Sequence, residues 1–116
     1  PSATEANSAL PRSRPDERMP ADEKTKVIQR IRGWALKPHL KVHRILGLVA
    51  RAPVALPRQQ LARAIERETG STNGYGAIAN LLSTEHNCYG RALVDVDGAI
   101  RLHPDVSEEV LSHVWS

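Results

Sequence analysis

Apolar residues recur at helical spacing in the first half of the chain. Val27, Ile31 and Trp34 fall at positions i, i+4 and i+7, which places them on one face of a helix. That helix must end before Pro38, because the residue that precedes a proline is pushed out of helical geometry. A second helix is predicted over residues 40–52. Its apolar stripe consists of Val42, Ile45, Leu46 and Val49.

The middle of the chain predicts two further helices separated by a tight turn. A short extended segment at 54–56 leads into a helix over 57–69, which has a proline at its first position. Gly70 ends that helix, because glycine readily adopts the left-handed conformation that terminates helices. The hydroxyl and amide side chains of the turn at 70–74 suit the start of another helix. We predict this next helix over 74–84.

Beyond residue 90 the apolar period changes from 3.6 residues to two. Alternating runs at 91–96 and 99–102 flank an Asp-Gly pair at 97–98. This dipeptide is typical of a type I′ turn, which needs positive φ at both central positions, so the sequence predicts a β-hairpin. A last helix is predicted to begin at a capping box formed by Asp105 and Glu108.

The order of these elements over residues 40–104 resembles a winged helix-turn-helix domain. The features that carry the resemblance are the extended segment at 54–56, the two helices joined by the turn at 70–74, and the hairpin at 97–98. The resemblance implies a mainly α fold with a small β-hairpin wing and extra helices at the N- and C-terminal ends. Such flanking helices, here 22–36 and 105–115, often form the interface of a homodimer.

Residues 1–21 contain four prolines and one leucine. This segment offers too little apolar surface to offset the entropy of ordering, so we expect a disordered tail and one domain over 22–116. The chain has no Phe, so the core must consist of Leu, Ile, Val and Ala. We expect Trp34 and Trp115 to be core anchors, with a dimer interface as the alternative.

Cys88 is the single cysteine of the chain and cannot form an internal disulfide. Secreted domains of this size usually carry several disulfides, so we expect the reducing cytoplasm, with a nucleoid association if the chain binds DNA. No apolar run is long enough to span a bilayer.

Charge is unevenly distributed along the chain. Residues 22–57 carry eight cations against two acids, for a net charge of +6, whereas residues 1–21 are neutral. Residues 58–116 carry five arginines against eight acids, for a net charge of −3. A basic segment of this kind favours a polyanionic partner.

The resemblance places the DNA contacts of such a domain in its second motif helix and in its wing. In DNA-binding members the second motif helix, which here corresponds to 74–84, enters the major groove. The wing, here 95–100, touches the DNA backbone or the minor groove. The residues that could read bases are Ser71, Thr72, Asn73, Tyr75 and Asn80. The start of the reading helix could also offer free backbone N–H groups to a phosphate.

Cations on several elements could anchor the phosphate backbone. The candidates are Lys37, Lys41, Arg44, Arg58, Arg91 and Arg101. If helical geometry continues from Lys37 to Arg51, their spacing places the first three and Arg51 on one face. Cations in contact with phosphates release counterions, which makes the binding dependent on salt.

These observations predict a protein that binds double-stranded DNA, as a transcriptional regulator or a chromosome- or plasmid-organising factor. The alternative is a winged-helix protein-interaction module within a larger assembly, because the acidic second half would repel a duplex that faced it. RNA is a third potential partner. If the acids at 66, 68, 95 and 97 interrupt the basic surface, the interaction module gains support.

The sequence carries no pattern typical of an enzyme. It has no glycine-rich phosphate loop with a lysine and no Ser-His-acid or Cys-His arrangement, so we expect neither catalysis nor a cofactor. His39 and His43 are four residues apart and could share a zinc ion on a helix, but no third ligand lies nearby. His86 and Cys88 are similarly isolated, so we expect no metal site.

Overall fold

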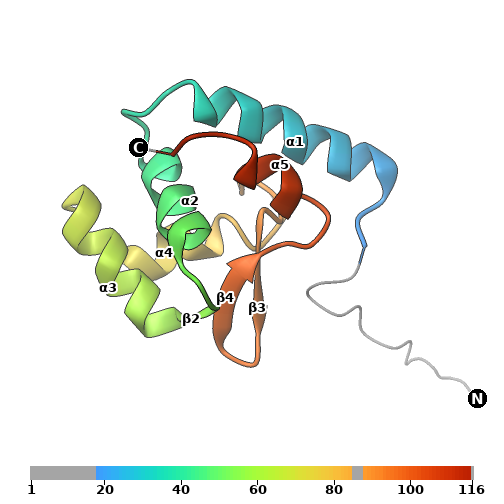
Figure 1. The fold of residues 1–116 in the computed structure, drawn as a ribbon. Coiled ribbons are helices and arrows are strands. Elements are labelled where there is room, and N and C mark those ends of the chain that lie inside the picture. Colours follow the sequence, from blue (N-terminus) through green and yellow to red (C-terminus); the bar gives the residue numbers. More distant parts are fainter. Residues whose placement is uncertain (1–17, 85–87, 116) are drawn as a thin grey trace, which may run out of the picture.

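Five helices and one small antiparallel sheet make up residues 18–84 and 88–115, which are the residues that the computed structural model describes (Figure 1). The elements are α1 (Ala21–Ala35), α2 (Lys41–Arg51), β2 (Leu56–Pro57), α3 (Arg58–Thr69), α4 (Gly74–Ala79), β3 (Leu93–Val96), β4 (Ala99–Leu102) and α5 (Ser107–Leu111). This confirms the expected mainly α fold with a small β-hairpin and extra helices at both ends. Most of the segment expected to be a disordered tail, residues 1–17, lies outside the described residues.

The sheet has the strand order β2-β4-β3, with both neighbouring pairs antiparallel. Leu56 of β2 lies opposite Ile100 of β4, so the short strand before α3 closes onto the hairpin. Asp97 and Gly98 both have positive φ, at 55° and 84°, as a type I′ turn requires. The Asp-Gly pair therefore forms the tight turn that the sequence predicts, and we refer to this hairpin as the wing.

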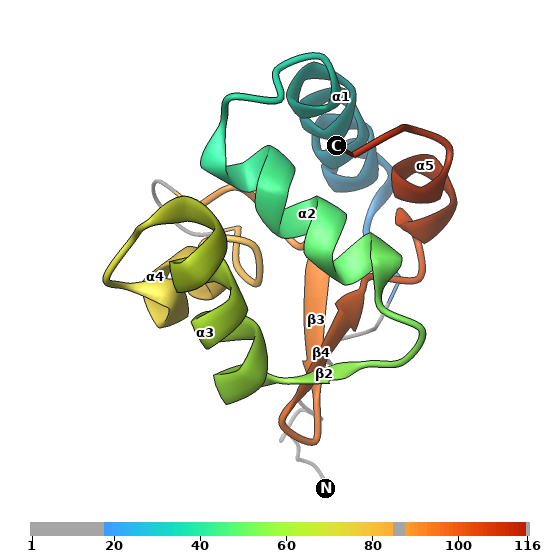
Figure 2. The same ribbon diagram turned by 60° about the vertical axis from the view of Figure 1, so that its left-hand side comes forward.

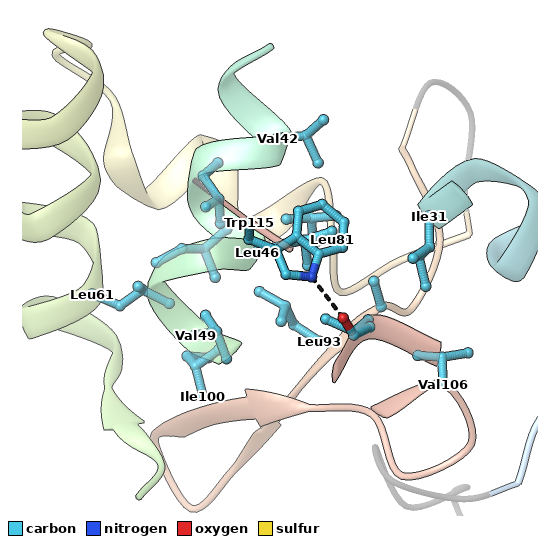
Figure 3. Close-up of a cluster of buried hydrophobic side chains, with 14 of the residues drawn as sticks. Ile31, Val42, Leu46, Val49, Leu61, Leu81, Leu93, Ile100, Val106 and Trp115 are labelled. Atoms are coloured by element: carbon cyan, nitrogen blue, oxygen red, sulfur yellow. Dashed lines mark hydrogen bonds between the residues drawn. The ribbon is translucent and has the colours of Figure 1, made fainter. Parts of the chain in front are cut away.

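Helix α2 is the centre of the packing. Figure 2 shows it in the middle, with α1 and α5 on one side, α3 and α4 on the other, and the sheet beneath. Its residue Leu46 is fully buried together with Ile31 of α1, Leu61 of α3 and Ile100 of β4 (Figure 3). Burial of this aliphatic surface, about 25 cal/mol per Å² removed from water, is the main term that stabilises the fold.

Two expected helix boundaries differ in the middle of the chain. Pro57 ends strand β2 and α3 begins at Arg58, whereas the prediction made Pro57 the first residue of the helix. Helix α4 ends at Ala79, although the apolar spacing predicted a helix to residue 84. Leu81 lies in a turn instead, and its side chain is buried. Its N–H donates to the Ile78 carbonyl, and its own carbonyl accepts from the N–H of Leu93 in β3.

The expected capping box at the last helix is wrong. Helix α5 begins at Ser107, and no side chain caps its first turn. The carboxylate of Asp105 accepts a hydrogen bond from the backbone N–H of Met19 at 2.7 Å instead. Met19 is buried in the core, so the ordered structure begins before residue 21, where the predicted tail ended.

The hydrogen bond from Met19 holds the pKa of Asp105 below its usual value, and electrostatic interactions with His103, Arg18 and Lys24 lower that pKa further. A carboxyl whose pKa is depressed in the folded state stabilises the fold above its unfolded pKa of about 3.9. This contribution is lost as the pH falls through the folded pKa. Asp105 therefore makes the docking of the N-terminal segment sensitive to acid.

Replacement of Asp105 by asparagine should lower the free energy of unfolding at neutral pH by about 1 kcal/mol, because a neutral acceptor replaces a charged one. It should also make stability less dependent on pH as the pH falls from about 5 to about 2. Urea unfolding across this range measures both effects. Glu108→Gln, an exposed carboxylate on α5, is the control, and unchanged pH dependence in Asp105→Asn would contradict the assignment.

Candidate nucleic-acid interface

A surface groove of about 230 Å³ lies between the start of α2 and helix α4. It is lined by Lys41, Val42, Ile45, Ser71, Asn73, Ala77, Asn80 and Tyr89. Its apolar lining residues come from α2 and α4, whereas Lys41 and Asn80 lie at the ends of these helices and Ser71 and Asn73 in the α3–α4 turn. We refer to it as the α2–α4 groove.

Four side chains predicted as site residues meet in this groove. Lys41 was expected to bind phosphates, and Ser71, Asn73 and Asn80 were expected to read bases. They come together because α3 packs against both α2 and α4, which brings the α3–α4 turn beside the first turn of α2. The other two predicted base-reading residues, Thr72 and Tyr75, are exposed at the turn and on the outer side of α4.

Two polar groups of the α2–α4 groove have no partner among the described residues. The side chains of Lys41 and Asn80 make no hydrogen bond or ion pair there. A free ammonium group can donate to a phosphate, and a free amide can both donate and accept at a base edge. The groove therefore presents hydrogen-bonding capacity that the fold does not use.

Three backbone N–H groups at the start of α4 are engaged within the fold. The N–H of Gly74 donates to the carboxylate of Glu66 at 3.1 Å, and the N–H of Gly76 donates to Asn73 Oδ1 at 2.9 Å. The N–H of Asn73 donates to the Ser71 hydroxyl oxygen. Asn73 is therefore a helix cap, as the turn chemistry predicts, and these three N–H groups are already engaged within the fold.

Tyr89 belongs to the α2–α4 groove, and sequence reasoning missed it. Its backbone N–H donates to the Asn80 carbonyl at 2.7 Å, and its carbonyl accepts from the guanidinium of Arg30. Its ring meets Trp34 edge to face, with the ring centroids 5.4 Å apart. Tyr89 comes after α4 in a segment without apolar periodicity, so no local signal pointed to it.

Three of the six predicted phosphate-binding cations lie at one corner of the molecule, which we call the basic corner. Lys37 lies in the turn after α1, Lys41 is the first residue of α2, and Arg44 lies one turn further along. All three are exposed. The guanidinium of Arg44 also donates to the Glu68 carbonyl at 3.0 Å, which ties α2 to the last turn of α3 beside the α3–α4 turn.

The helical face predicted to run from Lys37 to Arg51 is interrupted. Helix α1 ends at Ala35 and α2 begins at Lys41, so helical geometry does not continue through the intervening turn. Arg51 lies at the far end of α2, and its guanidinium donates to the Trp115 carbonyl. It is therefore separate from the basic corner.

The other three predicted phosphate-binding arginines lie on other parts of the structure. Arg91 makes two hydrogen bonds to the Glu23 carboxylate, at 2.7 and 2.8 Å, and ties the start of the wing to α1. Arg58 forms an ion pair with Asp95 of the wing, at 3.5 Å. Arg101 lines a different groove, between the end of α2, β4 and α5. The structure therefore does not merge these arginines with the basic corner.

The two histidines that are four residues apart, His39 and His43, lie in different surroundings. His43 is buried and its Nδ1–H donates to the Trp34 carbonyl at 2.8 Å, whereas His39 is exposed. Within residues 18–84 and 88–115, no three His, Cys, Asp or Glu side chains form a group that could hold a metal ion. None of the helices described there is long and apolar enough to cross a membrane.

Comparisons of the chain with protein-family models, with curated proteins and with solved structures gave no match. The residues of the chain itself are therefore the basis for proposing its function.

Proposed function

We propose that this chain is a non-catalytic winged-helix protein that binds double-stranded DNA through the basic corner and the α2–α4 groove. One observation carries the proposal: Lys41 lies in the same groove as Ser71, Asn73 and Asn80, with its own charge and the Asn80 amide unpaired among the described residues. Transcriptional regulation or the organisation of a chromosome or plasmid is the role that such binding would serve.

The basic corner supplies the electrostatic part of this binding. Lys37, Lys41 and Arg44 are exposed cations within one turn and the adjoining helix start. Each cation that meets a phosphate releases counterions, so three contacts give a slope of about −3 in log affinity against log salt. Arg58 and Arg91 have carboxylate partners and are assigned to holding the wing in place.

The expected homodimer remains part of the proposal. Leu36 at the end of α1, Leu111 of α5 and Val114 after it are exposed at 83%, 60% and 80%. Helices α1 and α5 are joined by Arg32, whose guanidinium contacts Glu109 at 3.2 Å. A dimer through these apolar side chains would present two basic corners to one duplex.

Titration of a labelled random-sequence duplex at about 50 mM and about 200 mM salt, monitored by fluorescence anisotropy, tests the proposal. Lys41→Ala should weaken binding and make the salt slope shallower by about 1, because one phosphate contact is lost. Lys26→Ala is the matched control, since Lys26 is also an exposed helical lysine but lies on α1. At stoichiometric concentrations, the titration should give two chains per duplex.

Absence of binding at the lower salt concentration would remove the proposal. Equal losses in Lys41→Ala and Lys26→Ala would show that net charge, and not the basic corner, governs the affinity.

A protein-interaction module is the second candidate, and the charge of the wing favours it. Asp95 and Asp97 both lie on the wing, and Arg58 is the cation paired with the first of them. A wing of this charge would not approach a phosphate backbone favourably. On this candidate function, the chain would not bind the duplex at either salt concentration.

A further inference from the structure

We propose that the α2–α4 groove holds a base that has left the stack, so that the preferred ligand is DNA with an unpaired nucleotide. This inference rests on the proposed function, and it adds to that function the form of nucleic acid that the site selects. The shape of the groove, the placement of Tyr89 and two polar groups without a partner among the described residues support it.

Shape is the first argument. Ser71 and Asn80 are only partly exposed and line a hollow together with apolar side chains of α2 and α4. The base edges of an intact duplex are themselves recessed, at the bottom of a major groove about 8.5 Å deep. Ser71 and Asn80 therefore reach the base edges of an intact duplex less readily than they reach its protruding phosphates. A base swung out of the duplex is a protruding ligand and can enter the hollow.

Helix α4 is poorly suited to reading an intact major groove. It has six residues, which corresponds to a length of about 9 Å. The sequence GYGAIA contains no cation and no amide side chain, and Tyr75 is its one large exposed side chain. Recognition of bases therefore falls to groups beside the helix, which are those of the α2–α4 groove.

Tyr89 supplies a stacking surface that is fixed in place before the ligand arrives. The residue is 39% exposed, although Trp34 packs against its ring and hydrogen bonds from Tyr89 N–H to Asn80 and from Arg30 hold its backbone. Bases stack on such aromatic rings with little dependence on sequence. Because the ring is already positioned, less conformational entropy is lost on binding.

The polar groups around Tyr89 match the remaining parts of a nucleotide. The Asn80 amide can donate to and accept from the Watson–Crick edge of a flipped base. Lys41, an exposed residue that lines the groove, can bind the phosphate that flanks that base. An unpaired nucleotide thus satisfies both of the groups that have no partner among the described residues.

Three labelled DNAs of otherwise identical sequence test this inference by fluorescence anisotropy. The first is an intact duplex, the second carries one additional unpaired nucleotide in one strand, and the third carries an abasic unit in place of that nucleotide. The abasic DNA has the same interruption of the duplex but no base to bind. We expect the second DNA to bind about tenfold more tightly than the other two, as loss of one stacked base would predict.

Variants of the α2–α4 groove assign this preference to its residues. In Tyr89→Leu and in Asn80→Ala, the affinity ratio between the bulged and abasic DNAs should fall to about one. Gln29→Ala, which removes an exposed amide on α1, should keep the ratio of the unchanged protein. Circular dichroism of each variant confirms that it remains folded.

The outcomes separate this inference from the proposed function. If all three DNAs bind equally, or if the abasic DNA binds as well as the bulged one, the inference is overturned while DNA binding stands. If none of the three DNAs binds, the proposed function fails and the inference fails with it.

Discussion

Replacement of Gly74 by alanine is expected to destabilise the domain by about 3 kcal/mol, because α3 and α4 approach each other too closely to admit a side chain there. A Cβ atom on Gly74 would lie 2.3 Å from the carbonyl oxygen of Ala62 and 2.8 Å from the Ala62 Cα. These atoms belong to the backbone of α3, so no side-chain rotation can relieve the overlap. The two helices would have to separate, and the α2–α4 groove would change with them.

Gly33→Ala is the matched control for this prediction. Gly33 lies inside α1, and a Cβ there would meet no atom within 4 Å. Alanine is favoured over glycine in a helix interior by about 1 kcal/mol, so this variant should gain stability. Urea unfolding monitored by circular dichroism measures both changes. A small or absent loss in Gly74→Ala would show that α3 and α4 can separate at little cost.

The elements that the sequence predicts well are those whose start or end is encoded locally. Helix α3 ends where Gly70 adopts φ of 73°, which an L-amino acid with a side chain rarely does. Helix α1 ends within three residues of Pro38, and the wing turns at the Asp-Gly pair at 97–98. In each case one or two residues determine the backbone geometry, and no distant contact is needed.

The expected boundaries that failed depend on contacts between distant residues. Leu81 has helical spacing from Ile78, yet its carbonyl accepts a hydrogen bond from Leu93 of β3. The chain therefore turns before a further helical turn can form. Asp105 has the sequence of a helix cap, yet Met19, 86 residues earlier, donates to its carboxylate. Periodicity and capping motifs describe neighbours in sequence, so neither can reveal such competition.

The candidate site also combines features that the local sequence predicts with features that depend on distant contacts. The turn at 70–74 and the helices beside it are encoded locally, so Ser71, Asn73 and Asn80 could be named as candidates, whereas their meeting with Lys41 depends on the packing of α3 against α2 and α4. Arg91 and Glu23 are 68 residues apart, and their ion pair depends on how α1 docks on the wing. Composition shows the cations, but only the tertiary structure shows which of them already have a carboxylate partner.

Replacement of Trp115 by alanine is expected to lower the free energy of unfolding by about 4 kcal/mol, the range found for large-to-small changes at buried aromatic residues. Trp115 is 7% exposed and closes the core over α2, where Gly47 leaves room for it (Figure 3). Its indole N–H donates to the Val110 carbonyl at 2.6 Å, and its ring lies 5.0 Å from that of His43.

The sequence left two interpretations of Trp115, a core anchor or part of a dimer interface, and its burial within one chain favours the first. Val54→Ala, at an exposed position outside the proposed dimer surface, should change stability by less than about 0.5 kcal/mol. Thermal unfolding of both variants at two protein concentrations separates the interpretations, because a subunit contact stabilises more at higher concentration. For a core anchor, the difference between Trp115→Ala and the unchanged protein is the same at both concentrations. A difference that grows with concentration would place Trp115 between subunits.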